Sequence, residues 1–139
     1  MLNLDNIDQE ILNSLDKDGR ISYSALAKKV NLTSAAVGQR VQRMIQDEVI
    51  LGFGTHINRE KIGLSIQAVI NLKLNFARIH DFNKVLCNYD EIEYCYRVTG
   101  EDCIIMKVNV RDNKHLLKFI DRISDYGHTK SSIILEKLV

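Results

Sequence analysis

The sequence predicts an α+β fold in which a helical N-terminal part precedes a part that mixes strands and helices. Over the first 46 residues, apolar side chains recur three and four positions apart, which is the period of an amphipathic helix. From residue 66 onward, apolar and polar residues alternate as in half-buried strands, and two helical stretches interrupt the pattern. The C-terminal order is βαββαβ, which is typical of a ferredoxin-like α/β sandwich.

Three helices are predicted in the N-terminal part. The first ends before Gly19, a residue that suits a helix stop. Ser22 is expected to cap a short second helix, and Thr33 a third, with a turn at Asn31 between them. This arrangement predicts a three-helix domain of the winged helix-turn-helix type. The residues expected to face inward are Leu4, Ile7, Ile11, Leu12, Leu15, Leu26, Ala27, Val30, Val37, Val41, Met44 and Ile45.

A β-prone segment with two glycines, residues 49–57, is interpreted as a strand that leaves the helical part. We therefore expect residues 1–50 to form the helix-turn-helix domain, 51–63 a linker strand and hinge, and 64–139 the ferredoxin-like domain. In that last domain the predicted strands are 66–75, 92–99, 103–110 and 130–138, and the predicted helices are 79–89 and 112–126.

The amino-acid composition limits which functions this chain can have. With 45% hydrophobic residues the chain can build cores, and a net charge of +1 means that any surface for a polyanion must be local. The chain contains no run of 18 apolar residues and its first 20 residues are acidic, so we expect a cytoplasmic protein without a membrane segment. Three cysteines without CxxC spacing and four scattered histidines predict neither a metal site, nor a cofactor, nor catalytic residues.

The segment from residue 20 to 46 is basic, with five cations and no acid. A basic helix-turn-helix predicts contact with DNA. Lys and Arg bind phosphates, while polar side chains of the second helix of the motif, which is the third helix of this chain, reach base edges. Arg40 and Arg43 are three apart and are expected on one outward face. The alternative is a solvated charged face, and for Lys28 and Lys29 a favourable position at a helix C-terminus. The predicted DNA-binding residues are Lys28, Lys29, Thr33, Ser34, Ala35, Ala36, Gly38, Gln39, Arg40 and Arg43.

Several motifs together resemble the Lrp/AsnC family of bacterial and archaeal transcriptional regulators over essentially the whole chain. They are LDNIDQEIL at residues 4–12, DGRIS at 18–22, LAKKVNLT at 26–33, VILG at 49–52 and VTGEDC at 98–103. The resemblance implies a sequence-specific regulator that binds a pseudo-palindromic site on double-stranded DNA and responds to an amino acid or a related small molecule. It also implies homodimers, and often octamers, formed through the α/β domain.

The same resemblance places an effector site at the loop between the second and third strands, with Thr99, Gly100, Glu101 and Asp102 as its residues. Backbone N–H groups at the glycine suit an effector carboxylate, and an acid suits its ammonium group. The family commonly has a second acid where this chain has Cys103, and the alternative for the loop is a plain hairpin turn.

Two other functions stay open from the sequence. Some proteins that resemble this family are tetrapyrrole decarboxylases of the siroheme type, although the isolated histidines of this chain weigh against such an enzyme. The third candidate is an amino-acid-sensing partner protein without DNA binding, against which the two arginines of the third helix argue.

Overall fold

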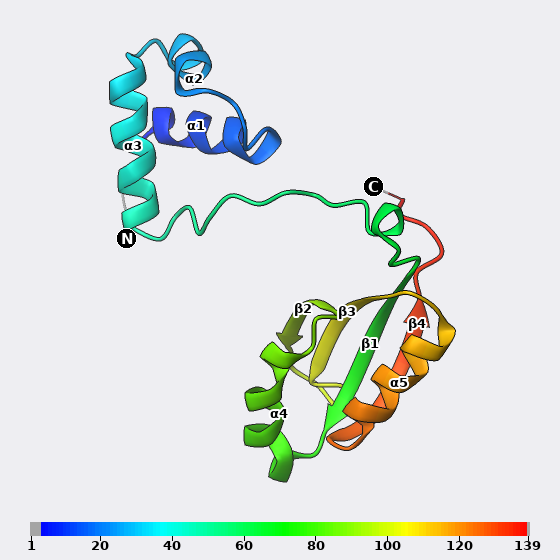
Figure 1. The fold of residues 1–139 in the computed structure, drawn as a ribbon. Helices are drawn as coiled ribbons and strands as arrows, with labels where there is room; N and C mark the ends of the chain where they lie inside the picture. The colour runs from blue at the N-terminus through cyan, green and yellow to red at the C-terminus, as the bar shows by residue number, and fades with distance from the viewer. Residues whose placement is uncertain (1–3, 139) are drawn as a thin grey trace. The chain divides into compact units, whose positions relative to one another are not determined.

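The computed structural model describes residues 4–138 of the chain. It divides into two compact units at His56–Ile57 (Figure 1). Each unit has a hydrophobic core of its own. Both predicted parts of the α+β fold are present, helices first and a sheet with helices second.

The N-terminal unit consists of α1 (Asn6–Lys17), α2 (Tyr23–Val30) and α3 (Ser34–Gln46). Ser22 and Thr33 cap α2 and α3 as predicted, because each side-chain oxygen accepts a hydrogen bond from a backbone N–H of the first turn. The fully buried side chains that join the three helices include Ile11, Leu26, Val37, Val41 and Met44.

The prediction of a strand at residues 49–57 is wrong for the single chain. The amides of Val49 and Ile50 bond to the carbonyl of Met44 and finish the end of α3. Beyond them, residues 51–58 are not part of a helix or strand. A strand needs a neighbour to share its ladder hydrogen bonds, and the regular elements within residues 4–56 are all helices.

The C-terminal unit contains an antiparallel sheet in the order β2-β3-β1-β4. Its strands are β1 (Ile66–Leu74), β2 (Ile92–Arg97), β3 (Ile104–Val110) and β4 (Gly127–Ile133), and the helices α4 (Ile79–Val85) and α5 (Asn113–Ser124) lie against one face (Figure 1). Short 3-10 turns occur at Glu60–Ile62, Phe76–Arg78 and Leu86–Asn88.

β4 differs from the predicted strand at both ends. It begins at Gly127, three residues before the predicted start, because Gly127 pairs with Leu74 at the end of β1. It ends at Ile133, opposite Ala68, since β1 itself begins only two residues earlier and offers little further backbone to pair with. Beyond it the amide of Ile134 still donates to the carbonyl of Gln67, and residues 134–138 of the predicted extension belong to no strand.

The two faces of the sheet differ. The face beneath the helices is buried and includes Ile70, Leu72, Met106 and Val108. The other face bears polar and aromatic side chains such as Lys73 and the tyrosines Tyr94 and Tyr96, whose rings lie 5.2 Å apart.

Candidate nucleic-acid interface and effector loop

α3 is the predicted recognition helix, and its outward side is defined by its cap and its buried stripe. Thr33 accepts a hydrogen bond from the amide of Ala36 at 3.1 Å and fixes the start of the helix. Val37, Val41 and Met44 are fully buried, so the opposite side faces away from the core. Of the predicted contacts at the N-terminal end of α3, the structure leaves some exposed and others half-buried: Thr33, Ser34, Ala35 and Gln39 are exposed, Ala36 and Gly38 half-buried.

Arg40 and Arg43 bind carboxylates of α1. Arg40 donates through Nη1 to Asp5 Oδ2 at 2.7 Å and to Asp8 Oδ1 at 2.8 Å. Arg43 donates through Nη2 to Asp8 Oδ2 at 2.6 Å. The side chain of Asp8 is 1% exposed and that of Arg40 is 26% exposed. The structure therefore places Arg40 half-buried against α1, and not on the outward face where the sequence analysis put it.

This contact shifts the pKa values of Asp5 and Arg40. The pKa of Asp5 is lowered, first by the hydrogen bond from the backbone N–H of Asp8 and then by the Arg40 guanidinium. The pKa of Arg40 is raised, first by its hydrogen bond to Asp8 and then by that to Asp5. Both shifts favour the charged forms, so the contact is an ion pair at neutral pH.

Two further glutamines of α3, Gln42 and Gln46, are exposed on the same side as Gln39 and were missed by the sequence analysis. Their positions follow from helical periodicity, because Gln39, Gln42 and Gln46 are three and four residues apart. The spacing of the glutamines was therefore available as a signal, and of the three only Gln39 is among the predicted contacts.

Lys28 and Lys29 occupy the last turn of α2, and both are exposed. Asn31 follows in the left-handed conformation, with a φ of 52°, and turns the chain toward α3. The two predicted lysines thus lie immediately before the turn of the helix-turn-helix.

The predicted effector loop joins β2 to β3. Gly100 has a φ of +111°, a conformation that favours glycine. Both acids of the loop bind lysines from neighbouring strands: Lys73 of β1 lies 3.4 Å from Glu101, and Lys130 of β4 donates to Asp102 at 2.8 Å. Asp102 raises the pKa of Lys130 through that hydrogen bond.

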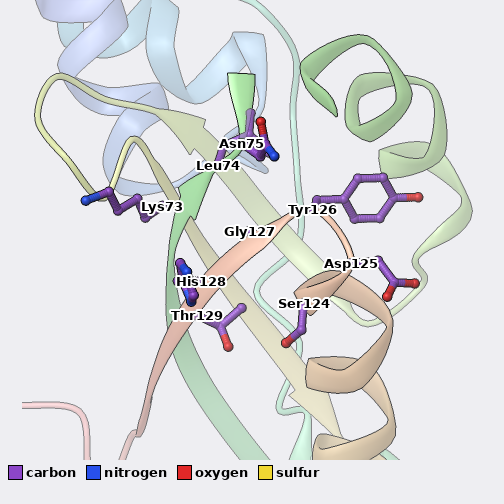
Figure 2. A pocket seen from close by; sticks show the side chains of 9 residues that line it. All are labelled: Lys73, Leu74, Asn75, Ser124, Asp125, Tyr126, Gly127, His128 and Thr129. Carbon is purple, nitrogen blue, oxygen red and sulfur yellow. The ribbon is translucent and has the colours of Figure 1, made fainter. Parts of the chain in front are cut away.

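Lys73 also lines an open cavity of about 600 Å³ at the end of the β1–β4 pair. Figure 2 shows Lys73 and His128 on one side of this pair and Tyr126 on the other. A Cβ on Gly127 would lie 2.1 Å from the carbonyl oxygen of Lys73, so the close approach of the two strands requires glycine there. No sequence motif indicates this cavity, since its residues meet only through strand pairing. They are Lys73, Leu74, Asn75, Ser124, Asp125, Tyr126, Gly127, His128 and Thr129.

Two family models match the chain. The AsnC-type helix-turn-helix domain matches residues 4–45, and the Lrp/AsnC ligand binding domain matches residues 67–139. The chain belongs to the Lrp/AsnC family. It is a helix-turn-helix transcriptional regulator of the Lrp/AsnC type, which confirms the predicted family, fold class and general function.

Curated relatives in this family are regulators of the same layout. The HTH-type transcriptional regulator LrpC of Bacillus subtilis is 27% identical over 137 residues, which cover 99% of this chain and 95% of the relative. An uncharacterised HTH-type transcriptional regulator of Pyrococcus abyssi is 36% identical over 135 residues, covering 94% and 85%.

Solved structures of Lrp/AsnC proteins superpose closely. Bacillus subtilis LrpC gives a TM-score of 0.92 at 27% identity and covers 99% of both chains. A feast or famine regulatory protein of M. tuberculosis, complexed with L-methionine, gives 0.91 at 31% identity and covers 99% of this chain and 95% of that one. Within residues 4–138 no helix is both long enough and apolar enough to cross a bilayer.

Proposed function

We propose that this Lrp/AsnC regulator binds a specific double-stranded DNA site through α3 and changes its affinity or assembly when an amino acid binds the C-terminal unit. The observation that carries the DNA half is the exposed N-terminal end of α3, where small residues such as Ala35 and Ala36 allow close approach to bases. We propose that the protein acts in the cytoplasm, where its DNA target lies.

Lys28 and Lys29 are proposed as phosphate contacts. They are exposed and lie beside the turn that leads into α3. Each phosphate neutralised by a lysine releases counterions, which makes affinity fall with salt by a logarithmic slope of about 0.9 per contact. Binding should therefore weaken strongly between low and moderate salt.

A homodimer is proposed as the binding unit. One face of the sheet is left uncovered by α4 and α5, and Tyr94 and Tyr96 lie exposed on it. Aromatic side chains on an open sheet face favour self-association with two-fold symmetry. Two α3 helices related by that symmetry would dock in successive major grooves of a pseudo-palindromic site, and dimers could assemble further into octamers.

The DNA half is tested by fluorescence anisotropy on the DNA upstream of the protein's own gene, with a scrambled duplex as reference, at two salt concentrations. Lys28→Ala/Lys29→Ala should weaken binding and flatten its salt dependence, whereas the matched pair Lys114→Ala/Lys118→Ala, exposed on α5, should not. Equal binding of both duplexes would overturn sequence-specific recognition. Arg40→Ala/Arg43→Ala is a poor test because it removes both counter-charges of buried Asp8.

The effector half is proposed for the Thr99–Asp102 loop and rests on the backbone conformation at Gly100 and the adjacent charges. A zwitterionic amino acid would take the place of one lysine contact, with its ammonium on Glu101 or Asp102 and its carboxylate on loop N–H groups or on Lys73. Calorimetric titration with an amino-acid panel that includes L-methionine tests it. Glu101→Gln should weaken any binding found and Glu60→Gln, an exposed control, should not; heat unaffected by Glu101→Gln would remove the loop from the site.

A further inference from the structure

We propose that α3 recognises A·T base pairs, with Gln39 and Gln42 on adenines and Ala35 and Ala36 against thymine methyl groups, while Arg40 and Arg43 hold α3 in place and do not read guanine. This inference rests on the proposed DNA binding and adds the class of base pair that the helix selects.

The exposed row of α3 carries the proposal. Ala35, Gln39 and Gln42 are exposed and spaced four and three residues apart, opposite the buried stripe of α3. At 1.5 Å per residue, the row from Ala35 to Gln42 extends about 10 Å along the helix, which matches about three base-pair steps of 3.4 Å. In a helix-turn-helix the N-terminal residues of the recognition helix contact base edges, and this row begins at Ala35, the second residue of α3.

The two cations of α3 are already bound. Arg40 lies between Asp5 and Asp8, and Arg43 binds the second oxygen of Asp8. A bidentate contact to guanine needs the same guanidinium donors, so it would leave the fully buried carboxylate of Asp8 without that partner. Two arginines and two aspartates also cancel in charge, which removes the attraction of this cluster for phosphates. Arg40 and Arg43 therefore act as positioning residues for the helix.

The chemistry of the remaining side chains agrees on one kind of base pair. A glutamine amide donates to adenine N7 and accepts from adenine N6, whereas guanine offers two acceptors and leaves the amide oxygen unmatched. Alanine methyls suit the thymine methyl group. Gln39, Gln42, Ala35 and half-buried Ala36 thus all fit A·T pairs in the major groove.

The test begins with the full-length protein and a random duplex pool, from which bound sequences are selected. A·T pairs are expected at the positions that become insensitive to base identity in Gln39→Ala or Gln42→Ala. On the selected duplex, each glutamine variant should lose about five- to a hundredfold in affinity. Gln9→Ala, the same truncation at an exposed position of α1, should leave the affinity unchanged.

Inosine substitution distinguishes recognition in the major groove from recognition in the minor groove. Replacing an A·T pair by inosine·cytosine keeps the minor-groove pattern of A·T but presents a guanine-like major groove, so binding should fall as it does in the glutamine variants. Unchanged binding, or selected G·C pairs whose preference survives both glutamine substitutions, would overturn the proposal while leaving a sequence-specific regulator. A pool from which duplexes are bound without any enriched sequence would instead overturn sequence-specific recognition, and the proposed base contacts with it.

Discussion

Asp8 lies fully buried in the helical unit, and both of its side-chain oxygens accept hydrogen bonds from arginines of α3. A buried carboxylate needs such partners, because removing one leaves its charge only partly compensated in the protein interior. Arg40→Ala leaves Asp8 with the half-exposed Arg43, and Asp8→Ala removes the acceptor that both arginines share. We expect each substitution to lower the free energy of unfolding by up to about 3–5 kcal/mol. Urea denaturation followed by circular dichroism measures the loss.

Arg43→Ala is the matched control for that prediction. Its side chain is 49% exposed, and Asp8 keeps Arg40 when it is removed. The expected loss is therefore smaller than for Arg40→Ala. If Arg40→Ala unfolds like the wild type but no longer binds DNA, Arg40 is a DNA contact and its role in holding α3 is wrong.

α3 as an element is weakened by a glycine in its interior. A Cβ at Gly38 would meet the ring of Tyr23 at 3.5 Å, an ordinary van der Waals contact, so alanine fits. Gly38→Ala should raise the free energy of unfolding by about 0.5–1 kcal/mol, because alanine has less backbone freedom to lose in a helix. Thermal unfolding checks the gain, and a loss of stability would mean that the Tyr23 ring cannot adjust.

Gly38→Ala also tests the prediction that Gly38 lies in the DNA interface. If the backbone approaches DNA closely at this position, the added methyl group should reduce affinity in the anisotropy assay even though the helix is more stable. Affinity equal to that of the wild type would remove Gly38 from the interface and leave Ala35, Ala36 and Gln39 as its centre.

Glu91, the residue immediately before β2, binds two side chains of α5. Glu91 Oε1 lies 3.0 Å from His115 Nε2 and also accepts a hydrogen bond from Arg122. Burial raises the pKa of Glu91, but the hydrogen bonds from His115 and Arg122 outweigh it, and the pKa is lowered overall from 4.5. A lowered carboxyl pKa stabilises the fold above pH 4.5, and this contribution is lost as the pH falls through the folded-state pKa.

Glu91→Gln should therefore reduce stability at neutral pH and flatten the dependence of stability on pH below about 4.5. Urea unfolding at a series of pH values from 3 to 7 measures this. Glu60→Gln, at an exposed position, provides the control curve and should follow the wild type. A Glu91→Gln curve parallel to that of the wild type would show that another carboxylate controls acid unfolding.

Elements defined by local signals were predictable, and those that depend on distant partners were not. Ser22 and Thr33 each cap the helix that follows by accepting a hydrogen bond from the backbone N–H three residues later. The local sequence was therefore enough to locate both helix starts. Arg40 and Asp8 are 32 residues apart, and only the packed helices reveal that the predicted DNA contact is an internal ion pair. Likewise, β4 starts in a polar segment because β1 supplies a backbone to pair with.

The two units of the molecule carry different proposed sites. Each has a separate core, one among residues 4–50 and the other among residues 66–126. The proposed DNA-binding helix belongs to the first unit, while the proposed effector loop and the uncovered sheet face belong to the second. An effector bound at that loop would act on DNA binding through a change in assembly or in the relation between units, and its influence would be limited to its differential affinity for the two states.

This division predicts that residues 57–139 fold without the helical unit and keep the oligomeric state of the full chain. The fragment retains all core residues of its own unit, including Phe82 and Phe119, and the exposed pair Tyr94 and Tyr96. Light scattering after gel filtration compares the fragment with the full chain. Tyr96→Glu should dissociate both in parallel, since it places a charge on the proposed contact face. A folded but monomeric fragment would instead assign self-association to residues 1–56, where Leu51 and Phe53 are exposed.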